Sequence, residues 1–277
     1  MGTVYMEILR LKKVVDKYID LNKRIVDFQS IVIVPSKKAI GMPVDEIDIE
    51  EDFIYFCFAK FTKTIIAIDN LIEYKLYEDA LILLRSCYES FINAKSVVFA
   101  PETLEHFVEY KLGLIDNKKY KKRKFGKIQN IDTEEEVVYI DKIYDIAKKA
   151  KEEISYKYLY KYLCEITHCN FITSGYYRDG VVYSYKKENM IALYNLLLWS
   201  IYINYKFYNC LIEDEIFDIE ELEDEVLDVL NDDILIIVEE FESMIKNIEE
   251  SSSKNKESYI TMLKELKNNI LDFVDEE

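Results

Sequence analysis

The sequence of 277 residues has little glycine, proline, tryptophan or histidine. It contains six Gly and three Pro, too few turn residues for a β-sandwich or barrel, which needs a turn every ~8–12 residues. Half of the residues are apolar, and this excludes a disordered or low-complexity chain because a large core can form. The composition therefore favours a folded protein with long regular segments and few turns.

Motifs for cofactors and common hydrolases are absent. The sequence lacks GxGxxG, GxxxxGK[ST], GxSxG and HExxH, so we expect no cofactor. The five cysteines are odd in number and form no CxxC pair, which favours a reducing cytoplasm. No second pair of ligands accompanies Cys164 and His168, so we expect no metal site. The N-terminus carries charge throughout and does not resemble a signal peptide.

The charge is strongly acidic, with 36 Lys and Arg against 53 Asp and Glu, or −17. Such a charge disfavours simple wrapping of nucleic acid. Residues 117–127 (NKKYKKRKFGK) reverse the sign locally, because seven of the eleven are basic. The segment is either a solvated loop or a contact for the RNA backbone, with Tyr120 and Phe125 available for stacking. The candidate nucleic-acid-binding residues are Lys118, Lys119, Lys121, Lys122, Arg123 and Lys124.

Apolar residues recur at spacings of three and four through most of the chain, which predicts helices. The predicted ranges are 3–29, 49–74, 77–99, 132–151, 155–172, 189–205, a tail from 218, and 259–274. Asp179-Gly180 between Tyr and Val residues predicts a small β-hairpin near 175–185. We therefore expect an all-α fold, with one bundle-like domain over 1–250. A C-terminal helix within 251–277 follows a polar joint and packs on the bundle or on another chain.

One segment, residues 189–205, has no charged residue and is close to the lower length limit for a membrane span. Asn189, Asn195, Ser200 and Asn204 interrupt it. We expect a buried central helix rather than a membrane span.

Two charged residues stand inside a helix that is apolar nearly all round. Arg85 and Glu89 are four residues apart, so they share a face and can pair. An arginine cannot lose its proton, so its burial requires a carboxylate or equivalent acceptors. The pair either locks two helices together or forms the charged floor of a cleft.

The second candidate stretch surrounds His168, one of two histidines. Cys164 and Glu165 precede it by four and three residues and share its helical flank. His168 could act as a general acid or base near neutral pH, or it could be an interior histidine bonded to Glu165 or a tyrosine. The other histidine, His106, lies beside acidic residues and is typical of a surface position.

These two helices resemble a family of uncharacterised helical bacterial proteins, over about residues 53–207. The matching residues are Ala80, Leu83, Leu84, Arg85, Ser86, Tyr88 and Glu89, then Tyr160, Leu163, Cys164, His168 and Asn170. The resemblance implies an all-helical domain. More distantly, the chain is similar to HEPN-type helical ribonucleases of toxin–antitoxin and phage-defence systems. Those proteins carry Arg and His on one helix, whereas Arg85 and His168 belong to two predicted helices here.

Two hypotheses about function follow. The first is a bacterial stress or phage-defence protein with HEPN-like ribonuclease activity. In this hypothesis His168 is the general acid or base, Arg85 stabilises phosphate charge and Glu89 orients Arg85. The residues expected around that site are Tyr88, Cys164, Glu165 and Asn170. The second is a non-enzymatic interaction protein whose acidic C-terminal helices pair in a homodimer or bind a basic partner.

Overall fold

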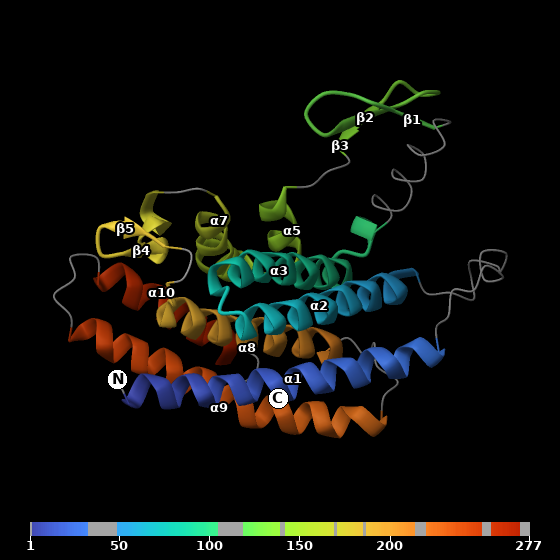
Figure 1. The fold of residues 1–277 in the computed structure, drawn as a ribbon. Coiled ribbons are helices and arrows are strands. Elements are labelled where there is room, and N and C mark those ends of the chain that lie inside the picture. Colours follow the sequence, from blue (N-terminus) through green and yellow to red (C-terminus); the bar gives the residue numbers. More distant parts are fainter. Residues whose placement is uncertain are drawn as a thin grey trace.

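The computed structural model describes residues 2–32, 49–104, 119–138, 142–168, 171–184, 187–213, 220–250 and 256–271. Long helices dominate this part of the chain (Figure 1), and the predicted all-α fold is confirmed. The long helices are α1 (Gly2–Val32), α2 (Ile49–Glu73), α3 (Tyr77–Phe99), α8 (Met190–Glu213), α9 (Glu220–Glu249) and α10 (Lys256–Leu271). Helix α3 matches its predicted range at both ends. The other bounds lie within about three residues of the predicted ranges, except that α8 continues past the predicted end at 205 to Glu213.

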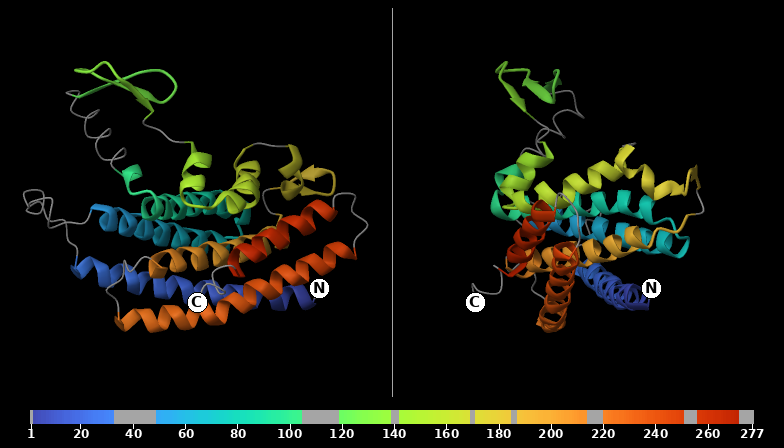
Figure 2. Two further views of the ribbon diagram at one scale, coloured as in Figure 1. Left: turned by 180° about the vertical axis from the view of Figure 1, so that it is seen from behind. Right: turned by 90° about the vertical axis from the view of Figure 1, so that its left-hand side faces the viewer.

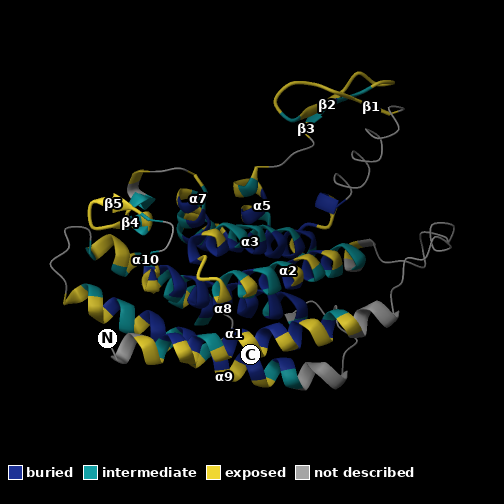
Figure 3. Ribbon diagram, viewed as in Figure 1, coloured by how far each residue is buried: buried dark blue, intermediate teal, exposed yellow. Residues whose placement is uncertain are grey.

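The uncharged segment forms α8, which is the centre of the bundle. Helices α1, α3 and α9 pack around it (Figures 1 and 2). Most of its apolar residues are buried (Figure 3), and Met190 and Ile191 in its first turn are exposed. The helix begins after Asn189, whose side-chain oxygen accepts hydrogen bonds from the backbone N–H groups of Ile191 and Ala192, both at 3.2 Å; this satisfies donors that a helix start leaves without partners. None of the helices in the described ranges is long and apolar enough for a bilayer.

Helix α10 packs on the bundle of its own chain, against α9 and the short helix α6 (Glu153–Ser155). Leu263, Leu266 and Ile270 are fully buried in the same core as the other long helices. The apolar face of α9 is also internal, because Ile237 and Phe241 are fully buried there. The apolar stripe of the acidic C-terminal region is therefore covered within the chain itself.

A layer of short helices covers α3 (Figure 2). It consists of α5 (Ile143–Lys149), α6 (Glu153–Ser155), a π-helical turn (Tyr156–Tyr160) and α7 (Lys161–Thr167). The predicted helix over 155–172 ends earlier than expected, because the backbone becomes extended at His168 (φ −93°, ψ 143°). This layer places the residues of the candidate site against α3.

Two small antiparallel sheets complete the described fold. The predicted hairpin is confirmed as β4 (Arg178–Asp179) and β5 (Val182–Tyr183), joined through Gly180 at φ +61°. The other sheet has the strand order β1 (Tyr120–Lys122), β2 (Lys127–Asn130) and β3 (Glu136–Val138). In Figures 1 and 2 it stands on the side of the bundle where α5 and α7 lie.

The three-stranded sheet corrects two sequence predictions. Residues 120–130 form a β-hairpin and not an irregular loop, and residues 136–138 form a strand where a helix from Asp132 was expected. Only Tyr120 and Ile128, with Val137 packed against them, form the apolar core of this sheet. Apart from Val138, the remaining strand positions hold charged or amide side chains. The alternation of apolar and polar residues that identifies a strand is therefore weak.

Candidate functional site

Arg85, Glu89 and Tyr160 form one hydrogen-bonded cluster between α3 and the π-helical turn. The Arg85 Nε atom donates to Glu89 Oε1 at 3.1 Å and to the Tyr160 hydroxyl at 3.2 Å. The Tyr160 hydroxyl donates to the same Glu89 oxygen at 2.9 Å. The Arg85 and Glu89 side chains are 27% and 28% exposed, so the cluster is neither a sealed core pair nor a fully open one. Burial, followed by the bond to Glu89, raises the pKa of Tyr160 well above its ordinary value.

His168 lies outside this cluster. Its backbone N–H donates to the Cys164 carbonyl at 3.1 Å and ends α7, and its side chain is exposed. Within the described residues, no side-chain contact joins His168 to Arg85 or Glu89. Cys164 is half-buried, and Glu165 is exposed. The structure therefore brings together Arg85 and Glu89, while His168 stands at the surface at the end of α7.

Tyr88 borders the cluster without a hydrogen bond to Arg85 or Glu89 among the described contacts. It is fully buried, and its ring packs on Tyr160 with 5.4 Å between ring centroids. Its hydroxyl lies 3.0 Å from the Ser155 hydroxyl. Asn170 lies outside the described residues.

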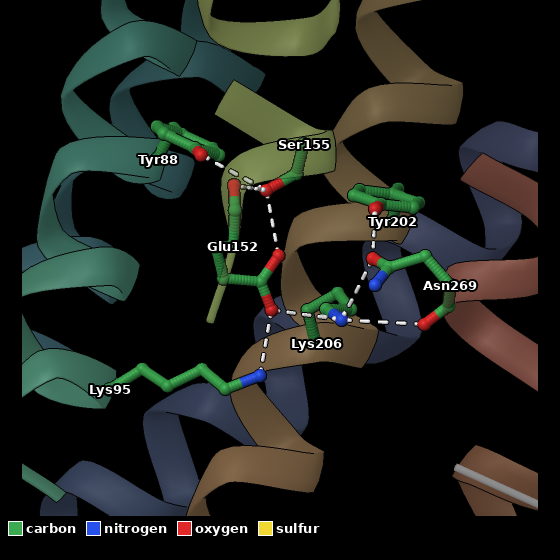
Figure 4. A network of polar contacts seen from close by, with 7 residues as sticks. All are labelled: Tyr88, Lys95, Glu152, Ser155, Tyr202, Lys206 and Asn269. Atoms are coloured by element: carbon green, nitrogen blue, oxygen red, sulfur yellow. Dashed lines mark hydrogen bonds and ion pairs between the residues drawn. The ribbon is translucent and has the colours of Figure 1, made fainter. Parts of the chain in front are cut away.

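A buried charged network next to this cluster was not predicted from the sequence (Figure 4). Glu152 Oε1 accepts hydrogen bonds from the Lys95 and Lys206 ammonium groups at 2.7 and 2.9 Å. The Ser155 hydroxyl donates to the other Glu152 oxygen at 2.7 Å. Lys206 also contacts the side-chain oxygen of Asn269 at 3.1 Å. The network thus ties α3, α6, α8 and α10 together.

The network has two ammonium groups for one carboxylate. The Glu152 and Lys206 side chains are fully buried, and Lys95 is 4% exposed. Burial alone would raise the pKa of Glu152, but Lys206 and Lys95 overcome that effect and lower the pKa below its ordinary value. Glu152 is therefore ionised and holds both lysines in place. Its position inside the core indicates a structural role.

Two features of the sequence are consistent with this network. Lys95 interrupts the apolar half of α3, and Lys206 follows the uncharged segment directly and is itself followed by apolar residues. Each lysine had to be either buried with a partner or turned to solvent. The partner, Glu152, comes from a polar stretch of the sequence, so only the tertiary structure identifies it.

The β1–β2 hairpin carries four of the six basic residues that were predicted to bind nucleic acid. Lys121, Lys122 and Lys124 are exposed, and none has a recorded ion pair in the part of the chain that the structure describes. Arg123 is exposed and donates from Nε to the Gln129 side chain at 3.1 Å. Lys119 is exposed and lies over the Tyr120 ring, and Lys118 falls outside the described residues.

The two aromatic residues of this hairpin differ in accessibility. Tyr120 is 5% exposed and belongs to the small core of the sheet, so the expectation that it is available for stacking is wrong. Phe125 is 95% exposed at the tip. We name the exposed Lys121, Lys122, Lys124 and Phe125 the basic tip.

Comparison with known proteins bears on the central part of the chain. Residues 51–179 match the model of a family of unknown function, DUF5677. The matched segment holds Arg85, Glu89, Tyr160, His168 and the basic tip. This match is consistent with the predicted resemblance to an uncharacterised family, while the motifs of that resemblance and the relation to HEPN-type ribonucleases stay predictions. No curated protein and no solved structure is significantly similar to the chain.

Proposed function

We propose that this protein binds RNA through the basic tip. The observation that carries the proposal is the group of exposed lysines on one hairpin, which form no ion pair with the residues that the structure describes, in a chain whose net charge is −17. Neighbouring cations repel one another when no anion lies between them, and RNA phosphates supply such anions at regular spacing.

The acidic remainder of the protein does not prevent this interaction. At physiological ionic strength, screening limits the repulsion between exposed charges to about 8 Å. After the basic residues of the hairpin, residues 128–168 contain six Lys and Arg against nine Asp and Glu, so the opposing net charge of this neighbouring segment is only −3. Lys148 and Lys161 are exposed on the short helices of that segment, and Lys142 is exposed directly before α5.

Fluorescence anisotropy with a labelled RNA oligomer tests the proposal. The variant K121E/K122E/K124E reverses three charges of the basic tip. The matched control K13E/K63E/K264E reverses three exposed lysines on α1, α2 and α10 and has the same net charge. We expect the first variant to lose at least about tenfold in affinity, and the control to lose much less. Equal losses would show that only net charge matters, and tighter binding of DNA of the same sequence would contradict the assignment to RNA.

Cleavage of the bound RNA, as expected of a stress or phage-defence ribonuclease, is the second candidate function. Its support is the exposed imidazole of His168 at the end of α7, one helical turn beyond Cys164. In a metal-independent cleavage, the imidazole takes the proton of a ribose 2′-hydroxyl, and that oxygen attacks the adjacent phosphorus. The next nucleotide leaves through its 5′-oxygen, which gains a proton, and a cyclic phosphate remains.

Arg85 would enter this reaction by stabilising the charge on phosphorus oxygens. It would have to exchange a bond to Glu89 or Tyr160 for one to phosphate. The test is cleavage by wild type, H168A and R85A, with unfolding curves for each. Loss of cyclic-phosphate product in folded H168A supports the second candidate, and unchanged cleavage in H168A contradicts it.

A further inference from the structure

Phe125 occupies an unusual backbone position at the end of the β1–β2 hairpin. Phe125 and Gly126 both have positive φ angles, +59° and +68°. The Lys127 N–H donates to the Lys124 carbonyl at 3.4 Å and closes the turn around them. Positive φ at both central residues is the pattern of a type I′ turn, in which Asn-Gly and Asp-Gly are the favoured pairs. The sequence places phenylalanine where asparagine or aspartate would be favoured.

This position is unfavourable for phenylalanine in two respects. A residue with a bulky side chain is disfavoured in the left-handed region, because its Cβ crowds the backbone. The ring is also 95% exposed and so gains nothing from burial. Packing within the chain therefore does not account for the ring, and strained, exposed residues of this kind occur at binding sites.

The charges around the ring indicate what it contacts. Lys121, Lys122 and Lys124 lie beside the ring and are exposed, and none forms an ion pair within the described ranges. Cations beside an aromatic ring suit a ligand with phosphates and flat apolar faces, which describes a nucleic acid with accessible bases. Bases inside a duplex are stacked on each other and offer no free face, whereas those of a single strand do.

We propose that Phe125 stacks on an unpaired base, so that the basic tip selects single-stranded RNA over duplex RNA. This inference rests on the proposed RNA binding and adds the class of RNA to it. The lysines hold the phosphates of either form, and Phe125 discriminates between them.

Two substitutions separate stacking from folding. F125N places a residue that tolerates the left-handed region in the turn, so the hairpin is retained while the ring is lost. F125W keeps a ring of larger area. It also adds a fluorophore at the tip, where the native Trp199 is buried and supplies a constant background. The urea midpoint of each variant, compared with that of wild type, shows that the fold is intact.

Anisotropy is then measured with single-stranded and duplex RNA of the same sequence. We expect F125N to weaken single-strand binding by about fivefold or more, which corresponds to the low end of the free energy of stacking one base on an aromatic ring. Duplex binding should be unchanged. F125W should bind the single strand at least as tightly as wild type, with its fluorescence quenched. Single-strand binding by F125N equal to wild type would overturn the inference while RNA binding stands.

Two other outcomes would contradict the inference. If neither RNA binds wild type, RNA binding itself fails. Vesicles containing phosphatidylserine provide the second arm, because basic residues around an exposed ring also suit an anionic membrane surface. Tighter binding to vesicles than to RNA, with a blue shift of the F125W fluorescence, would overturn the inference in favour of a membrane contact.

Discussion

Replacing Glu152 by glutamine should be among the most damaging single changes in the protein. Its carboxylate lies 2.7 and 2.9 Å from the ammonium groups of Lys95 and Lys206, and both contacts are made by the same oxygen. Glutamine keeps the shape of the side chain but removes its charge. Two ammonium groups would then lie close together in the core with no carboxylate between them.

The magnitude follows from this geometry. Removing one partner of a buried ion pair costs about 3–5 kcal/mol, because the other charge is left without compensation. Two lysines lose the same carboxylate at once here, and none of the three side chains is more than 4% exposed. We therefore expect E152Q to lower the free energy of unfolding by about 4–5 kcal/mol, a large part of the ~5–15 kcal/mol of a typical domain.

Urea unfolding followed by circular dichroism at 222 nm measures this change. The control is E239Q, which removes the acid of the exposed Arg10–Glu239 pair and should cost roughly 0–1 kcal/mol. The pKa of Glu152 is lowered by folding, so its contribution is present above its unfolded pKa of about 4.3 and is lost as the pH falls through the folded value. The difference between E152Q and wild type should therefore shrink in acid. A loss below about 1 kcal/mol near pH 7 would refute the reasoning.

Three smaller predictions use the same unfolding assay. Y160F removes the hydroxyl that joins Arg85 and Glu89, and we expect a loss of about 1–2 kcal/mol; no loss would mean that the cluster does not stabilise the fold. N189A removes the cap of α8 and should cost about 1 kcal/mol, whereas an unchanged midpoint would contradict the capping role. Burial raises the pKa of Asp233, so ionisation of this carboxyl opposes folding as the pH rises. We therefore expect D233N to have a higher urea midpoint than wild type at about pH 8 and the same midpoint in acid, where Asp233 is protonated.

The long helices could be predicted because their apolar residues repeat with helical spacing. Helix α3 carries apolar residues on nearly every face, and its bounds at Tyr77 and Phe99 were predicted closely. Helix α8 was predicted as buried from its lack of charge, and it lies at the centre of the bundle. In both cases the signal lies within one continuous segment.

The three-stranded sheet escaped prediction because its strands are only three or four residues long and its core rests on Tyr120 and Ile128. Runs of lysine on β1 resemble a solvated loop, and acidic residues after β2 resemble the first turn of a helix. The local composition therefore predicted a loop and a helix at segments that form strands.

The candidate site was predicted in part. The pairing of Arg85 with Glu89 follows from their spacing on one helix, but Tyr160 is 71 residues beyond Glu89 and meets it only in the folded chain. Similarly, Lys95 and Lys206 meet Glu152 from two separate helices. Such contacts depend on how helices pack, which periodicity in the sequence does not specify.

The salt dependence of RNA affinity tests the proposed RNA binding most directly. The account predicts that the logarithm of the affinity falls linearly with the logarithm of salt concentration. Each single-strand phosphate contact contributes about 0.7 to that slope, so K121E/K122E/K124E should lower it by about 2, and K13E/K63E/K264E should leave it unchanged. No RNA binding at low salt, or the same slope in both variants, would contradict the assignment of RNA binding to the basic tip.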